Sequence, residues 1–411
     1  MRKIIYEHLI TMSLFLVICM ILCSCNSVHM EAPMQSDIHS INDEELTPLN
    51  NEKTLQFQLI GNSFNLATDY CAVVNNGFYR LTNKADGSIA LLFYDFTDRS
   101  ISEKRHIETS SEVTDMFITS DGNTLYTFFD KRIDNDNCLN IKVLSSAGET
   151  KAEYNVNNYV INSNSKVALY GEDLIISSVL TEKNATYNIL RISAATGEAN
   201  TLMSAGKNEE INIVDVADTK LCLLIISKDE KQRILSYEII TIDMETGDRD
   251  SVMSFSSNEI QGVFSGGNLY YFKENDLLIR KLILSAKEET LLTEEISNIA
   301  SRIGASQVVL DNNVRDDKLI IGFYDEKPLA FMAIDISLSG NAEEVPLLNE
   351  PIVAETEEFF VVLLSDVEDR VKDFVDKNGT TEEVIRVEPS FAIISKEDYW
   401  HGNGYNIFRH A

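Results

Sequence analysis

The side chains most able to do chemistry in this sequence are its carboxylates, because 65 Asp and Glu residues stand against only 35 Lys and Arg. Two neighbouring carboxylates can act as acid and base on a glycosidic bond. With so many acids, however, some pair falls near any channel by chance, and the sequence does not select one. Glu355, Glu357 and Glu358 precede an apolar run and are most simply a solvated turn.

A stretch near the C-terminus looks most like an exposed binding site. Residues 398–405 place Tyr399 and Trp400, the only tryptophan, among residues typical of turns. Aromatic side chains stack on sugars and anchor protein partners, so we predict Tyr399 and Trp400 as binding residues. The alternative is that Trp400 packs inside the last structural unit.

Metal and cofactor chemistry find little support in the sequence. Residues 134–137 alternate Asp and Asn, but the twelfth position of a calcium loop there is Ser145 rather than Glu, and its sixth is not Gly. We interpret this segment, and residues 311–317, as solvated turns, with an improvised calcium site as the alternative. The histidines are too few and too scattered for a zinc cage. We expect no metal and no cofactor.

The start of the chain indicates where the protein works. Arg2 and Lys3 precede an apolar run from residue 9 to 24, which reaches about 24 Å as a helix and is too short for the ~30 Å membrane core. The run ends in Leu22, Cys23, Ser24 and Cys25, which resembles the lipobox of bacterial lipoprotein precursors, although that pattern prefers a small residue where Cys23 stands. An ordinary secretory signal is the alternative.

The lipobox resemblance implies cleavage before Cys25 and a diacylglycerol thioether on that cysteine. Its acyl chains would hold the protein on the extracytoplasmic side of the cell membrane. We therefore predict a signal peptide over residues 1–24, a lipidated and polar tether over 25–52, and a folded body over 53–411. The formal charge is −30, which makes nucleic acid an improbable partner.

Three cysteines follow the predicted anchor, namely Cys71, Cys138 and Cys222. Their odd number and wide spacing describe neither a disulfide framework nor a zinc site. We interpret them as buried, inert thiols. A bridge between Cys71 and Cys138 is the alternative, because the expected compartment is oxidising.

The body carries a repeated pattern of β-strands. Runs of β-branched and aromatic residues alternate with turns, and glycine recurs where the third strand of a unit should turn into the fourth, as at Gly148, Gly197 and Gly247. Counting Asp98, Lys287, Gly340 and Gly379 as equivalents gives a period of about 47 residues. Four-stranded units of that length are typical of β-propeller blades.

The turns resemble those of bacterial propellers of the YVTN and TolB-like kind, which implies a fold and no particular activity. We predict an all-β propeller of eight four-stranded blades, in which residues 54–60 complete the last blade. Seven blades are the alternative count, and tandem sandwiches or a β-solenoid are the alternative folds. The function predicted is a membrane-anchored module that binds a protein or glycan. The alternatives are a surface polysaccharide hydrolase or lyase and a scaffold subunit of an envelope complex.

Overall fold

The computed structural model describes residues 57–60 and 71–410, with gaps at 110–112, 134–135, 163, 182–184, 257–261, 274–276, 283–284, 286, 292, 337–341, 346–351, 378–379, 403 and 405. The chain divides into two units, Met1–Asp43 and Glu44–Ala411, and every described residue belongs to the second. The predicted signal peptide, Cys25 and the whole of the predicted tether lie outside the described residues. Within the described part, no helix is long and apolar enough to cross a membrane.

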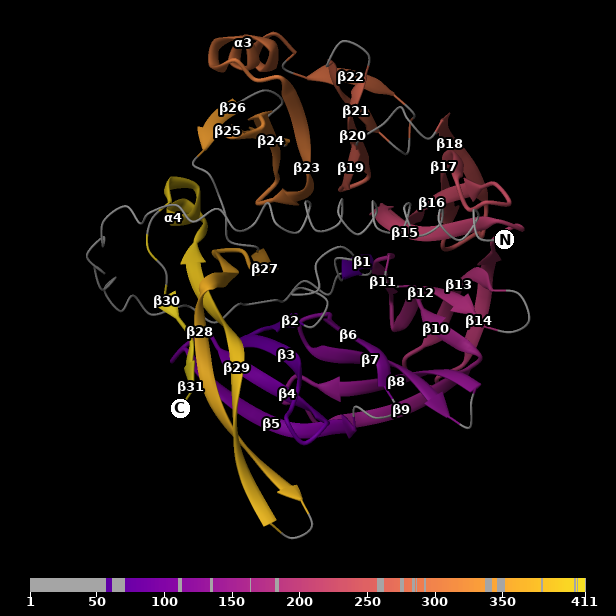
Figure 1. The fold of residues 1–411 in the computed structure, drawn as a ribbon. Coiled ribbons are helices and arrows are strands. Elements are labelled where there is room, and N and C mark those ends of the chain that lie inside the picture. The colour runs from indigo at the N-terminus through magenta and orange to yellow at the C-terminus, as the bar shows by residue number, and fades with distance from the viewer. Residues whose placement is uncertain are drawn as a thin grey trace, which may run out of the picture. The chain divides into compact units, whose positions relative to one another are not determined.

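The described strands form seven sheets, which we number in chain order and which are antiparallel apart from one short added strand (Figure 1). Sheet 1 contains β2 (Cys71–Val74), β3 (Gly77–Asn83), β4 (Ser88–Asp95) and β5 (Ser100–Thr109), and β31 (Arg409–His410) adds to β5 in parallel. Sheet 2 contains β6 (Val113–Ser120), β7 (Thr124–Ile133), β8 (Asp136–Ser145) and β9 (Thr150–Asn157). Sheet 3 contains β11 (Val167–Tyr170), β12 (Asp173–Leu180), β13 (Thr186–Ser193) and β14 (Ala199–Ser204), with β1 (Phe57–Ile60) beside β11 and β10 (Tyr159–Ile161) beside β12.

The remaining four sheets follow the same order of strands. Sheet 4 contains β15 (Glu209–Ala217), β16 (Lys220–Lys228), β17 (Ile234–Asp243) and β18 (Arg249–Ser256), and sheet 5 contains β19 (Gly262–Ser265), β20 (Asn268–Lys273), β21 (Leu277–Leu282) and β22 (Glu288–Leu291). Helix α3 (Thr293–Ile303) leads to sheet 6, which contains β23 (Gln307–Arg315), β24 (Lys318–Asp325), β25 (Lys327–Asp335) and β26 (Ala342–Val345). Sheet 7 contains β27 (Ile352–Glu355), β28 (Phe359–Lys377), β29 (Thr380–Ser395) and β30 (Asn406–Ile407), with α4 (Lys396–His401) between the last two.

Sequence explains why these segments become strands. The second strands are runs of apolar residues buried on both faces, as in β16, because neighbouring sheets cover them. Gly148, Gly197 and Gly247 adopt φ of 81°, 74° and 79° in the turns before the fourth strands. That conformation costs little for glycine only, so the predicted role of these three glycines is confirmed.

Hydrophobic clusters join the sheets in sequence. Each sheet shares a buried cluster with the next, from sheets 1 and 2 through to sheets 6 and 7. A further cluster packs Phe78 and Tyr94 of sheet 1 against Phe391 of sheet 7, so the series returns to its first sheet.

Two details of the predicted repeat are wrong. Residues 57–60 pair with β11 of sheet 3 and do not complete the C-terminal sheet. Gly379 lies between β28 and β29, which are the second and third strands of sheet 7, so it is not equivalent to Gly148. Because β28 and β29 have 19 and 16 residues, that one hairpin is long enough to resemble an additional unit. Among the described residues, seven sheets are present and the count of eight is not confirmed.

Candidate functional site

The predicted aromatic site is not an exposed platform. Tyr399 and Trp400 lie on α4 rather than in a turn, and they are only 1% and 7% exposed. Both rings pack edge-on against Phe360, and the indole nitrogen of Trp400 donates a hydrogen bond to Asp316 Oδ2 at 3.2 Å. Both rings belong to the buried cluster of sheets 6 and 7, so the alternative that Trp400 packs inside the last structural unit is confirmed.

The other candidates from the sequence are dispersed or engaged. Glu355 forms an ion pair with Lys396 at 2.9 Å, while Glu357 and Glu358 lie exposed in the turn before β28. Residues 134–135 lie outside the described residues, and in the part that the structure describes no three His, Cys, Asp or Glu side chains are grouped to hold a metal.

The three cysteines are buried and free of disulfides, as the first interpretation predicted. Burial raises the pKa of the Cys138 and Cys222 thiols. Because the thiolate is the reactive form, these two side chains are inert.

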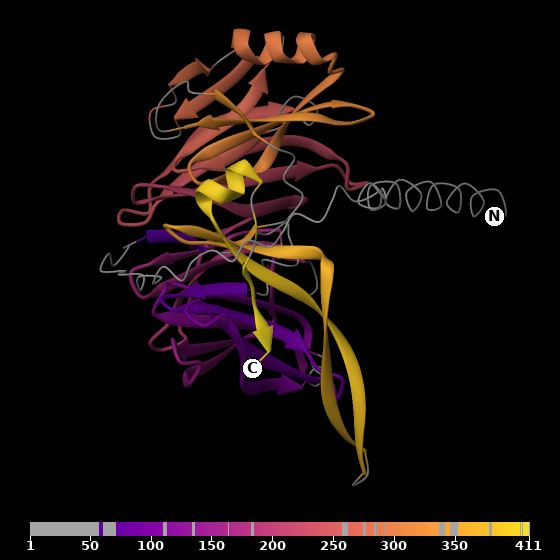
Figure 2. The same cartoon turned by 90° about the vertical axis from the view of Figure 1, so that its left-hand side faces the viewer.

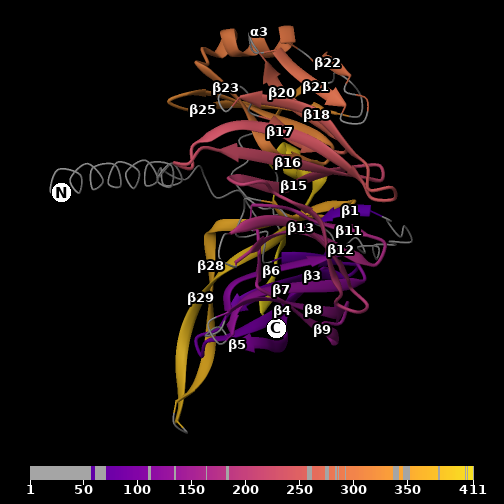
Figure 3. The same ribbon diagram turned by 90° about the vertical axis from the view of Figure 1, so that its right-hand side faces the viewer.

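The hairpin of β28 and β29 is the most unusual element of the molecule, and it was not predicted from the sequence. No other described strand exceeds 10 residues, so this hairpin projects well beyond its sheet (Figures 2 and 3). We call its outer part, residues 368–389, the arm. Its register pairs Lys372 with Ile385 and Phe374 with Glu383. Since side chains alternate between the two faces of a hairpin, the arm has an inner and an outer face.

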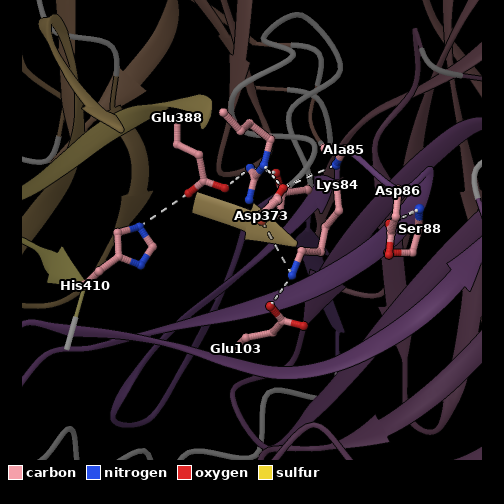
Figure 4. Close-up of polar contacts among 10 residues, drawn as sticks. Lys84, Ala85, Asp86, Ser88, Glu103, Asp373, Glu388 and His410 are labelled. Atoms are coloured by element: carbon pink, nitrogen blue, oxygen red, sulfur yellow. Dashed lines mark hydrogen bonds and ion pairs between the residues drawn. The ribbon is translucent and has the colours of Figure 1, made fainter. Parts of the chain in front are cut away.

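The inner face of the arm is charged and buried (Figure 4). Asp373, only 5% exposed, accepts a hydrogen bond from Arg386 Nε at 2.7 Å on the adjacent strand. It also accepts one from the backbone N–H of Ala85 at 3.3 Å, and Lys84 Nζ lies 3.8 Å away. These contacts hold the arm against the turn between β3 and β4 of sheet 1.

A second carboxylate extends this charged cluster toward the C-terminal strand. Glu388, 2% exposed, forms an ion pair with Arg386, whose Nη1 also donates to Thr82 Oγ1 at 3.2 Å. His410 Nε2 approaches Glu388 Oε2 at 3.6 Å (Figure 4). Arg386 therefore serves two buried acids at once, which makes it the central cation of the cluster.

The charge of Asp373 is stabilised in this position. Burial alone would raise its pKa, but the hydrogen bonds from Arg386 and Ala85, together with the positive charges of Arg386 and Lys84, outweigh burial and lower the pKa below its usual range. Asp373 is thus an ionised anchor, and the buried Glu388 is paired with the same Arg386. This arrangement is suited to holding the arm rather than to proton transfer.

The outer face of the arm exposes large apolar side chains. Phe374, Ile385 and Val387 are 65%, 58% and 51% exposed, and Lys372 and Glu383 form an ion pair at 2.8 Å beside them. A cluster of large exposed apolar side chains on a projecting element is typical of an interaction site.

The signal for the arm was present in the sequence. Asn378 and Gly379 are the strongest two-residue hairpin motif, and they stand between two runs of alternating apolar and charged residues. The charges at inward positions concealed it, because inward positions of a strand are expected to be apolar.

Comparison with known proteins supports the fold. No protein-family model matches the chain, and a search of curated proteins finds no relative. Among solved structures, a prolyl endopeptidase is similar with a TM-score of 0.50 at 8% identity, over 83% of this chain and 55% of that one. The β-propeller domain of the trilobed protease from Pyrococcus furiosus gives a TM-score of 0.46 at 11% identity, over 82% of this chain and 96% of that one.

TolB from Acinetobacter baumannii is a more distant match, with a TM-score of 0.30 at 11% identity, over 63% of this chain and 61% of that one. The predicted all-β, propeller-type fold is confirmed at that coarse level. This chain spans only about half the length of the prolyl endopeptidase, and such low identities show fold alone.

Proposed function

We propose that this protein is a binding module, held by a lipid on Cys25 at the extracytoplasmic face of the membrane, and that its arm end binds a protein partner. The arm end comprises the hairpins that join the second strand of each sheet to the third. The opposite end comprises the hairpins that join the first strand of each sheet to the second and the third strand to the fourth.

The observation that carries this proposal is the placement of exposed apolar side chains. All of the exposed large hydrophobic side chains that the structure describes lie at the arm end: Ile133, Ile234, Leu235, Leu329, Phe374, Val384, Ile385 and Val387. Chance would spread them over both ends. Burying such side chains against a partner provides most of the free energy of protein association.

Among the described residues, the opposite end has no exposed large hydrophobic side chain. Its turns carry exposed acids such as Asp218, Glu245, Asp248 and Glu357. These charges keep that end solvated, and the net charge of −30 speeds encounter with cationic partners. The contrast supports a single binding end.

The body we propose is a closed propeller of seven blades. The cluster shared by sheets 7 and 1 supports closure. The chain after sheet 7 supports it too, because its last strand, β31, pairs with Ser100 and Ile101 of β5 in sheet 1. Closure would hold the loops of all blades in fixed relative positions, as a binding surface requires.

Site-specific cross-linking in producing cells tests the binding end. A photoreactive residue at Ile385 or Leu235 should capture the same envelope protein, whereas the same probe at Thr246 or Glu357 should not. Equal capture from both ends would overturn the proposal, and so would capture from the opposite end alone.

Anchoring has a separate test. Cys25→Ala protein should leave the membrane fraction once its signal is processed, while the unchanged protein stays there. Retention of the processed variant would contradict lipidation. The polysaccharide-acting alternative has no specific observation in its favour, because the buried carboxylates of the arm are held by Arg386.

A further inference from the structure

Sheet 7 is incomplete beside the arm. In the other six sheets the fourth strand has 4 to 10 residues, whereas β30 has only 2. It pairs with Ala392 and Ile393 alone. Phe408 adds one backbone hydrogen bond to Phe391 at 3.0 Å, after which the chain leaves for sheet 1.

The outer edge of β29 therefore has no strand beside it, among those described, from Thr380 to Ser390. This edge faces the position that the fourth strand takes in the other sheets. The backbone N–H and C=O groups along such an edge are a template for another extended chain. Residues 54–60 were predicted to complete this sheet, but the part of that segment that is described pairs with β11 instead.

The side chains along this edge suit an added strand. Ile385 and Val387 are two residues apart, lie on the same face, and are more than half exposed. An extended segment with apolar side chains at alternate positions would pair with both. Pro389 lacks a backbone N–H and so limits the pairing toward the root of the arm.

Charge indicates which segments fit. Glu382 and Glu383 are exposed on β29 near the tip, and the whole chain carries a net charge of −30. A second copy of this chain would be repelled by the same charge, whereas a basic segment would be attracted.

We propose that the outer edge of β29 binds an extended segment of a partner protein as an added strand, and that this segment has alternating apolar side chains and a net positive charge. The inference rests on the proposed function and names the class of partner. Main-chain hydrogen bonds would supply affinity, and contacts with Ile385 and Val387 would supply selectivity.

An array of eight-residue peptides tests this proposal on the mature protein. Each peptide has Val, Ile or Phe at alternate positions, with Lys, Arg, Ser or Glu between them. We expect the basic peptides to bind and the acidic ones not to bind. Ile385→Thr with Val387→Thr, which keeps β-branched side chains, should weaken binding about tenfold or more, equivalent to ~1.4 kcal/mol.

Two controls separate strand addition from simple attraction of charge. Leu202→Thr with Val252→Thr changes apolar residues on the outer strands of sheets 3 and 4 and should leave binding unchanged. A peptide can be N-methylated at its odd-numbered or at its even-numbered residues, and each pattern removes the N–H groups along one edge of the extended peptide. Only the pattern that removes the N–H groups facing β29 should abolish binding.

Three outcomes would overturn the proposal: no peptide binds, both methylated patterns bind like the parent peptide, or both double variants behave alike. A dimer that the arm variant converts to a monomer would make a second copy the occupant instead. Failure of strand addition, with cross-linking still confined to the arm end, would leave the proposed function standing.

Discussion

The two faces of the arm reverse the usual distribution of side chains. Its inner face buries Asp373, Arg386 and Glu388, while its outer face exposes Phe374 and Ile385. A hairpin optimised only for stability would bury the apolar face. This difference indicates that ionic contacts hold the arm in place and that its exposed apolar residues are available to bind a partner.

The largest effect on stability is expected when Arg386, the central cation of the inner face, is removed. Arg386→Ala leaves Asp373 and Glu388 buried without their shared partner, which typically costs about 3 to 5 kcal/mol. We expect urea denaturation to show a loss of that size. Arg370→Ala, an exposed cation of the arm, should change the free energy of unfolding by less than about 0.5 kcal/mol. Equal effects would mean that the cluster does not hold the arm.

A second buried acid, whose pKa is raised rather than lowered, sharpens the comparison. Asp130, 5% exposed, accepts hydrogen bonds from the N–H of Ile161, and burial raises its pKa to about 7. Because the folded protein binds a proton more tightly than the unfolded chain, Asp130 lowers stability as the pH rises from about 4 to 7. Asp130→Asn should therefore stabilise the protein more at pH 8 than at pH 5, by roughly 3 kcal/mol at most. A pH-independent effect of the substitution would contradict this assignment.

Asp373 should show the opposite dependence on pH. Its folded-state pKa is lowered, so its contribution is fully present above about pH 4 and is lost as the pH falls through the folded value. Unfolding free energies measured between pH 5 and pH 3 should fall more steeply for the unchanged protein than for Asp373→Asn. Parallel slopes would show that the charge of Asp373 contributes nothing.

The smallest effect on stability is expected on the outer face. Ile385→Thr with Val387→Thr should change the free energy of unfolding by no more than about 0.5 kcal/mol, because these side chains are more than half exposed. Phe391→Ala in the core shared by sheets 1 and 7 should instead cost about 3 to 5 kcal/mol. A large loss from the outer pair would mean that the face is already covered.

The sequence predicted the parts of this protein that depend on local patterns. Apolar runs such as that of β16 and the glycines of the tight turns carry their conformation in their own chemistry. Pairing between distant segments was not predictable in this way. The first strand of every other described sheet also ends its strand order, so no local pattern selects β11 as the partner of residues 57–60. The burial of Asp373 likewise depends on a cation far away in the sequence, Lys84. Trp400 was predicted in a turn but lies in the short helix α4. The start of this helix is hard to recognise in the sequence, because its N-cap, Ser395, is also the last residue of β29.

The register of the arm makes its reach adjustable in fixed steps. Lys372 pairs with Ile385, and the pairing continues without a shift from Glu368 to Lys377. Deleting two residues from each strand would shorten the arm by about 7 Å and keep every remaining side chain on its face, whereas deleting one from each would exchange the faces. The length of the hairpin can thus change in steps of two residues per strand, without any change to the sheet that supports it.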